Sequence, residues 1–124
     1  MSTLKVNTIQ DTSGSNSSTA AEISQGRAKA WANVNGEGTT SIRESYNFSS
    51  VTDNGTGKYT LSFTNSMTDA NYSVVMGVGD INDTNRTMAS FSNTVAAGSF
   101  FVETKYALEN GRRDCGGGYF AVFR

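Results

Sequence analysis

Apolar and polar residues alternate along most of the chain with a period of two, which is the spacing of a half-buried β-strand. In segment 27–34, three alanines and Val34 share one face of such a strand, while Trp31 lies on the other face. Segment 71–78 differs, because its run Val74-Val75-Met76 is almost continuously apolar and predicts a strand buried on both faces. In chain order, strands are expected over residues 27–34, 39–45, 46–52, 58–63, 71–78, 87–95, 99–108 and 119–124.

Turn residues separate these segments. The chain has 13 glycines and 0 prolines, so its turns depend on glycine, asparagine and aspartate, which reach positive φ at little cost. The segment from Asp53 to Gly57 is the strongest hairpin signal. About seven short strands joined by such turns predict an all-β fold, a single antiparallel β-sandwich of jelly-roll-like type over residues 27–124. Removal of the last strand, 119–124, should therefore unfold the domain.

Residues 1–26 are expected to form an extended N-terminal arm that ends in a short helix. Leu4, Val6 and Ile9 alternate with polar residues in a strand-like start. Because a lone strand is unstable in water, these three residues are predicted to bind a partner. A frayed terminus is the alternative interpretation.

A short helix is predicted between the arm and the sandwich. It follows a polar tract, residues 11–18, for which we expect flexibility. Thr19 and Glu22 have the spacing of a capping box, in which each residue binds the backbone amide of the other. Gly26 can end the helix after one to two turns.

Composition excludes several classes of protein. Ten Lys plus Arg oppose eleven Asp plus Glu, for a formal net charge of -1, so no basic face for nucleic acid is expected. No apolar run has the length of a signal peptide or a membrane span, so membrane insertion and export by the usual route are not expected. Only 36% of residues are hydrophobic, and such a thin core favours self-association.

The residue types required for common catalytic sites are scarce. The chain has 0 histidines, which removes the usual general base and metal ligand and the serine–histidine and cysteine–histidine pairs. Its 1 cysteine forms no internal disulfide and builds no cysteine-based zinc site. No acid pair has a recognisable glycosidase arrangement. Segment 80–85 alternates oxygen ligands, but Phe91 stands where a calcium loop needs glutamate. We therefore predict no enzyme, no metal and no cofactor.

Aromatic and loop residues are the remaining candidates for contacts. Trp31 is predicted to make an intersubunit or intersheet contact, because it lies opposite the alanine face of its strand. Packing in a core or interface is favoured over ligand binding for the tyrosines. Arg112 and Arg113 form a candidate surface-contact loop, facing an acidic host glycan or a neighbouring subunit. They would also favour a thiolate at Cys115 if that thiol were exposed, although an incidental loop cysteine is the preferred interpretation.

Several segments carry a resemblance to a known group of proteins. The start, from Ser2 to Gly36, with Leu4 to Gln10 as its most distinctive phrase, resembles small tail-fibre-like and virion structural proteins of marine phages, of the cyanophage type. Segments 49–57, 59–63 and 69–75 are similar to the body of those proteins. The resemblance implies a virion role, a β-rich domain and a homotrimer.

From this resemblance we expect a non-enzymatic phage virion structural protein, assembled in the host cytoplasm. Its arm would attach to other virion proteins of the particle, and its β-domain would contact a host-surface glycan or protein in host attachment. A capsid decoration or cement protein is one alternative, which differs in where the arm binds. A carbohydrate-binding module is the other, and it predicts sugar binding by an isolated monomer.

Overall fold

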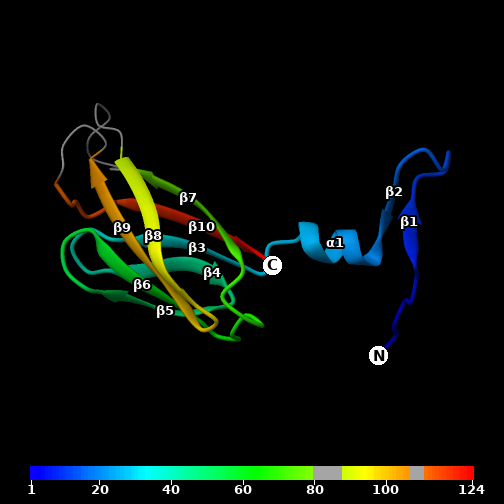
Figure 1. Cartoon of the computed structure of the whole chain (residues 1–124), viewed down its shortest axis with the longest axis horizontal. Helices are drawn as coiled ribbons and strands as arrows, with labels where there is room; N and C mark the ends of the chain where they lie inside the picture. Colours follow the sequence, from blue (N-terminus) through cyan, green and yellow to red (C-terminus); the bar gives the residue numbers. More distant parts are fainter. Residues whose placement is uncertain (80–87, 107–110) are drawn as a thin grey trace.

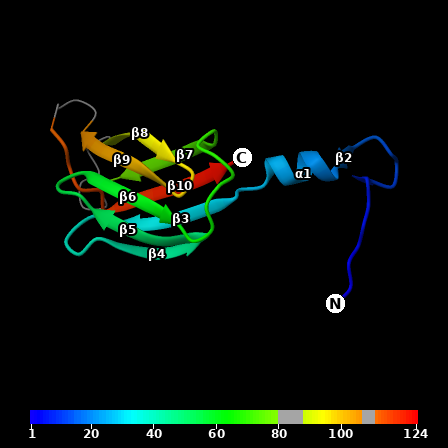
Figure 2. The same ribbon diagram turned by 60° about the horizontal axis from the view of Figure 1, so that its bottom comes forward.

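The computed structural model describes residues 1–79, 88–106 and 111–124, with residues 88–93 described by their backbone alone. Two four-stranded antiparallel sheets pack face to face, and an arm projects from one end of this sandwich (Figure 1). Figure 2 shows the two layers from another side. The expected all-β fold is confirmed, because strands predominate among the described residues and only one short helix accompanies them.

The first sheet has the strand order β4-β3-β10-β7, and the second has the order β5-β6-β9-β8. The first contains β3 (Ala30–Asn35), β4 (Ser41–Tyr46), β7 (Ser73–Gly79) and β10 (Gly117–Phe123). The second contains β5 (Phe48–Asp53), β6 (Lys58–Phe63), β8 (Met88–Ala96) and β9 (Ser99–Tyr106). The last strand, β10, pairs with both β3 and β7, so residues far apart in the sequence become neighbours across it.

The core lies between the sheets and is rich in aromatic rings. Phe100 is fully buried, and its ring centroid lies 5.9 Å from that of Phe48, 5.9 Å from that of Phe63 and 6.0 Å from that of Phe120. Such edge and offset contacts are the arrangements that aromatic rings prefer. The predicted alanine face of β3 also faces this core, as Ala30 and Ala32 are 0% and 3% exposed. Small side chains there let the two sheets approach closely.

The chain crosses from the first sheet to the second at Asn47. The pattern predicted one strand over 46–52, but Tyr46 ends β4 and Phe48 begins β5, because Asn47 has a φ of 59°. Asparagine tolerates this left-handed conformation better than most residues. Its side-chain oxygen accepts a hydrogen bond of 2.8 Å from the backbone N–H of Asn65, which holds the corner.

Strand β7 is less buried than its apolar sequence predicted. Val75 is 60% exposed, whereas Val74 and Met76 are partly buried against the core. The prediction of burial on both faces is wrong here, because β7 is an edge strand of an antiparallel sheet whose outer face is open.

The arm contains β1 (Thr8–Gln10), β2 (Ser17–Thr19) and α1 (Ala20–Gly26). A strand beginning at Leu4 was predicted, but the strand starts at Thr8 and pairs with β2 of the same chain. The polar tract predicted to be flexible forms the connecting turn, where the Asp11 carboxylate accepts hydrogen bonds from Asn16 Nδ2 at 2.8 Å and from the backbone N–H of Ser15 at 3.0 Å. These hydrogen bonds hold the pKa of Asp11 below its usual value.

The capping box at the start of α1 is confirmed. The Thr19 hydroxyl accepts a hydrogen bond from the backbone N–H of Glu22 at 3.2 Å, and the Thr19 N–H donates to Glu22 Oε2 at 2.7 Å. No helix in the described part of the chain is long and apolar enough to cross a membrane.

Candidate functional site

Exposed apolar side chains form a row across the outer face of the first sheet. Trp31 of β3 is paired with Tyr46 of β4 on one side and with Ala121 of β10 on the other, and Ala121 is paired with Val75 of β7. The exposed fractions are 41% for Trp31, 55% for Tyr46 and 60% for Val75. The period-two alternation explains this arrangement, because each strand sends its other side chains into the core.

A second row lies beside the first and completes a hollow. Tyr119 of β10, which is 51% exposed, is paired with Asn33 of β3 and Gly77 of β7. Residues 31–33, 75–77 and 119–121 of the three strands line a shallow hollow of about 470 Å³, which we call the outer-face groove.

Small residues create the floor of the outer-face groove. A Cβ atom at Gly77 would lie 3.9 Å from Cδ2 of Tyr119, and one at Gly117 would lie 2.9 Å from the Tyr119 hydroxyl. The tyrosine ring therefore lies along backbone that carries no side chain. Together with Ala121, these glycines leave space between Trp31, Tyr119 and the β7 edge.

One polar side chain braces the rim of the outer-face groove. Arg43 donates hydrogen bonds to Asn33 Oδ1 at 3.3 Å, to Asn35 Oδ1 at 2.8 Å and to the Gly116 carbonyl at 2.7 Å. These contacts span the register shift between β3 and β4 that follows Asn33. The arginine thus fixes the β3 side of the groove to the loop that leads into β10.

A buried polar cluster lies at the end of the sandwich away from the arm. Tyr59 is 1% exposed, and its hydroxyl lies 3.1 Å from Asp114 Oδ1, 3.3 Å from the Gly36 carbonyl and 3.3 Å from the Cys115 N–H, which donates to it. Burial raises the pKa of Tyr59 well above its usual range. The tyrosine therefore stays neutral and joins three segments of the chain.

Cys115 belongs to this buried cluster. Its thiol is fully buried, and burial raises its pKa, so the thiol stays protonated. The arginine-stabilised thiolate considered for an exposed Cys115 is therefore not formed. The cysteine has a packing role in the core.

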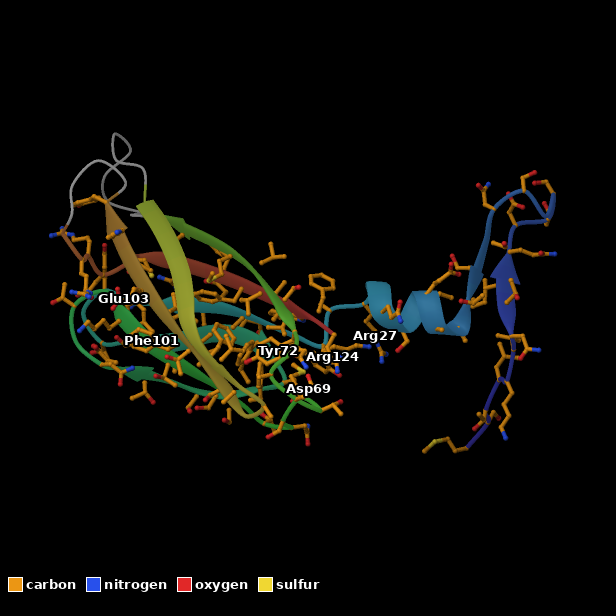
Figure 3. The ribbon with its side chains drawn as sticks, in the orientation of Figure 1. Arg27, Asp69, Tyr72, Phe101, Glu103 and Arg124 are labelled. Carbon is orange, nitrogen blue, oxygen red and sulfur yellow. The ribbon has the colours of Figure 1, made fainter. Side chains whose placement is uncertain are left out.

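The two arginines predicted as a surface-contact loop both have partners within the chain. Arg112 Nη2 lies 3.0 Å from Oε1 of Glu103, a residue at the end of the sandwich remote from the arm (Figure 3). The guanidinium carbon of Arg113 lies 5.7 Å from the ring centroid of Tyr106, a cation–π distance. These contacts pin the loop to β9, and a contact with a glycan or subunit stays a prediction.

The structure places the predicted arm residues and Trp31 in separate parts of the molecule. Leu4, Val6 and Ile9 lie in the arm and are 84%, 41% and 56% exposed. Trp31 lies on the outer face of the first sheet, and an intersheet contact is wrong for it because the opposite face of β3 meets the other sheet. Its intersubunit contact stays a prediction.

The outer-face groove as a whole was not predicted. Tyr119 was assigned to core or interface packing, and the core assignment is wrong because its exposed fraction is 51%. The sequence did contain the separate parts of the groove, namely large aromatic residues on two strands and the small residues Gly77 and Ala121. Only the strand order shows that these residues are neighbours.

No candidate metal site is found in the described part of the chain, where no three His, Cys, Asp or Glu side chains gather. The oxygen-rich segment 80–85, which was weighed for calcium, lies outside the described residues. A surface ion pair joins Asp69 and Arg124 at the end of the sandwich from which the arm projects, with Nη2 2.6 Å from Oδ2 (Figure 3). It ties the C-terminal residue to the loop before β7.

Comparison with known protein families gave one match that bears on function. The profile of the family described as Dyp-type peroxidase, C-terminal, matches residues 4–107, which is most of the chain. Searches of curated proteins and of solved structures gave no match.

This match overturns the resemblance to marine phage proteins. The expected role as a non-enzymatic, tail-fibre-like virion protein is wrong, and so are the capsid decoration and carbohydrate-binding alternatives, because the match points to a peroxidase family. The expected virion location and the exclusion of an enzyme are wrong for the same reason. Short phrases rich in turn residues recur in many β-domains, whereas the family profile extends over residues 4–107.

The match brings a disagreement in fold. The C-terminal domain of that family is a ferredoxin-like α+β fold, whereas the described residues of this chain form an antiparallel β-sandwich. A ferredoxin-like domain packs helices against one sheet. Here a second sheet takes the place that such helices would occupy.

The residues of the chain do not fit a haem of the kind that peroxidases hold. Peroxidases bind haem iron through a proximal histidine, and this chain has 0 histidines. The thiol of Cys115, another possible type of iron ligand, is fully buried with a raised pKa. The outer-face groove is a shallow hollow on a sheet surface, without the enclosing walls that a macrocycle requires.

Proposed function

Because the chain belongs to the family of the Dyp-type peroxidase C-terminal domain, we propose that it has a peroxidase-related function and serves there as a protein-contact part. The match over residues 4–107 supports the peroxidase half of this proposal. The outer-face groove supports the contact half. The proposal assigns no iron chemistry to this chain, since the chain supplies no histidine.

The groove and the adjacent Tyr46 together have the composition of the centre of an interface. Aromatic side chains are enriched at such centres and charged ones are depleted. Trp31, Tyr46, Val75 and Tyr119 are 41%, 55%, 60% and 51% exposed. Since an aromatic side chain has about 150–250 Å² to bury, the three aromatic ones offer roughly 300 Å². A patch of this size is near the largest that a monomer usually exposes, and such patches are often functional.

The first experiment asks where peroxidase activity resides. The purified chain is mixed with haem, and haem binding is followed by its absorbance while peroxide-dependent oxidation of a phenol is measured. We expect no more oxidation than free haem gives. A stoichiometric haem complex with turnover above that background would place the reaction in this chain and overturn its assignment as a contact part.

The second experiment asks whether the chain is associated with a peroxidase. The tagged chain is isolated from its own cells, and peroxide-dependent phenol oxidation is measured in the isolated material. We expect activity that is lost in Val75→Lys, at an exposed position of the groove, and retained in Thr52→Lys, at an exposed position of the other sheet. If the isolated material shows no peroxide-dependent oxidation, the peroxidase-related function is wrong.

A further inference from the structure

We propose that the outer-face groove of one copy binds residues 1–7 of the arm of a second copy, with Leu4 and Val6 as the anchoring side chains. This inference rests on the proposed function, because it identifies the protein that the outer-face groove contacts as a second copy of this chain. Two apolar surfaces are exposed among the residues that the structure describes. One is the arm, where Leu4 is 84% and Val6 41% exposed, and the other is the groove.

The dimensions of the two surfaces agree. Residues two apart on an extended segment point to the same side and lie about 6.7 Å apart. In the groove, Trp31 and Val75 lie two strand spacings apart, on either side of Ala121, which is about 9.6 Å. The spacing of Leu4 and Val6 is smaller than this width, so both side chains can lie between Trp31 and Val75 over the alanine and glycine floor.

The first residues of the arm are available for such a contact. Residues 1–6 have no assigned secondary structure, and the hairpin of β1 and β2 begins only at Thr8. The extended segment can thus adopt the conformation that a groove requires without breaking the hairpin. Seven extended residues span about 23 Å, which is enough to cross three strands.

The direction of the arm favours a second copy over the same copy. In both views the arm lies beyond α1, away from the sandwich (Figures 1 and 2). Lys29 Nζ donates hydrogen bonds to the carbonyl oxygen and, at 3.1 Å, to the hydroxyl of Ser24, which ties the end of α1 to the start of β3. The helix therefore directs residues 1–7 away from the groove of their own chain.

Exchange of arms can form a closed oligomer, because every copy has one arm and one groove. The smallest closed form is a dimer in which each copy inserts its arm into the other, as in domain swapping. This arrangement covers both apolar surfaces in every copy.

The test uses two full-length variants that fail in different ways. The arm variant is Leu4→Asp with Val6→Asp, and the groove variant is Val75→Asp, all at exposed positions. The matched controls are Ile23→Asp, at an exposed apolar position of α1, and Thr52→Asp on the other sheet. Circular dichroism and thermal unfolding establish that each variant is folded.

Sedimentation at micromolar concentration gives the decisive result. We expect the parent chain and both controls to be oligomeric and each variant alone to be monomeric. An equal mixture of the two variants should associate, since one supplies an intact groove and the other an intact arm. A monomeric parent chain would overturn the inference. So would an arm variant that still self-associates while the groove variant does not, because the two sheets would then pack directly on each other.

Fluorescence provides an independent readout, because the chain has 1 tryptophan and it lies in the groove. A peptide of residues 1–10 added to the full-length arm variant should shift the Trp31 emission to shorter wavelength. The same peptide with both Asp substitutions should leave the emission unchanged. If the unsubstituted peptide causes no shift, the groove does not bind the arm, whatever the peroxidase assays show.

Discussion

Replacement of Gly57 by alanine tests how the loop before β10 is held to the sandwich. Gly57 has a φ of 63°, its N–H donates to Asp114 Oδ1 at 2.7 Å, and its carbonyl accepts from the Thr104 N–H at 2.8 Å. A Cβ at this position would meet the carbonyl oxygen of Thr104 and lie 2.8 Å from both the backbone nitrogen and oxygen of Arg113. These are backbone atoms, so the contacts cannot be relieved by a change of rotamer.

The expected cost has two parts. A residue with a Cβ in the left-handed region costs about 1–2 kcal/mol. Overpacking of a filled site adds about 1–3 kcal/mol. Gly57→Ala should therefore destabilise the protein by about 2–5 kcal/mol.

Gly38→Ala is the matched control for this prediction. Gly38 has a φ of 64°, and no atom lies within 4 Å of its Cβ position. It should lose only the conformational part, about 1–2 kcal/mol. Free energies of unfolding from urea titrations, followed by Trp31 fluorescence and circular dichroism, give both values. If the two variants differ by less than about 0.5 kcal/mol, the crowding around Gly57 has been misjudged.

Three further predictions concern the core and the last strand. Tyr59→Phe leaves buried partners of the hydroxyl without a hydrogen bond and should cost about 1–3 kcal/mol in urea unfolding, whereas Tyr119→Phe, at an exposed ring, should change stability by less than about 0.5 kcal/mol. Burial raises the pKa of Tyr72 from 10.0 to about 12, so its contribution to stability is complete below pH 10 and is lost as the pH rises through about 12. Between pH 10 and pH 12 the free energy of unfolding, measured by urea titration, should decrease less steeply with pH for Tyr72→Phe than for the parent chain. Equal slopes would contradict the raised pKa of Tyr72. Deletion of residues 119–124 removes most of a strand that pairs on both sides, so the remaining chain should lack cooperative thermal unfolding, and a sharp transition near that of the parent would contradict the strand order.

Local features of the fold were predictable from the sequence because their causes are local. Period-two alternation places Ala30 and Ala32 on one face of a strand whatever the rest of the chain does. The capping box at Thr19 and Glu22 depends only on four consecutive residues. The hairpin between β5 and β6 follows from the Asp53 to Gly57 turn in the same way.

Function was not predictable at this level. The phage resemblance depended on short phrases such as Leu4 to Gln10, and turn-rich β sequence of that kind is shared by unrelated domains. The family match depends instead on residue preferences over positions 4–107. No phrase within that span contains a histidine, the usual proximal ligand of peroxidase haem.

The sequence by itself determined which side chains share a face within each strand, and the tertiary structure decided which faces meet. Placing β10 between β3 and β7 brings Trp31, Val75, Tyr119 and Ala121 together, although these positions are up to ninety residues apart. It also leaves one face of β7 open, which local apolar content alone could not show. Side-chain alternation is a property of the backbone within a strand, whereas strand order results from the burial of all strands at once, and the outer-face groove depends on that order.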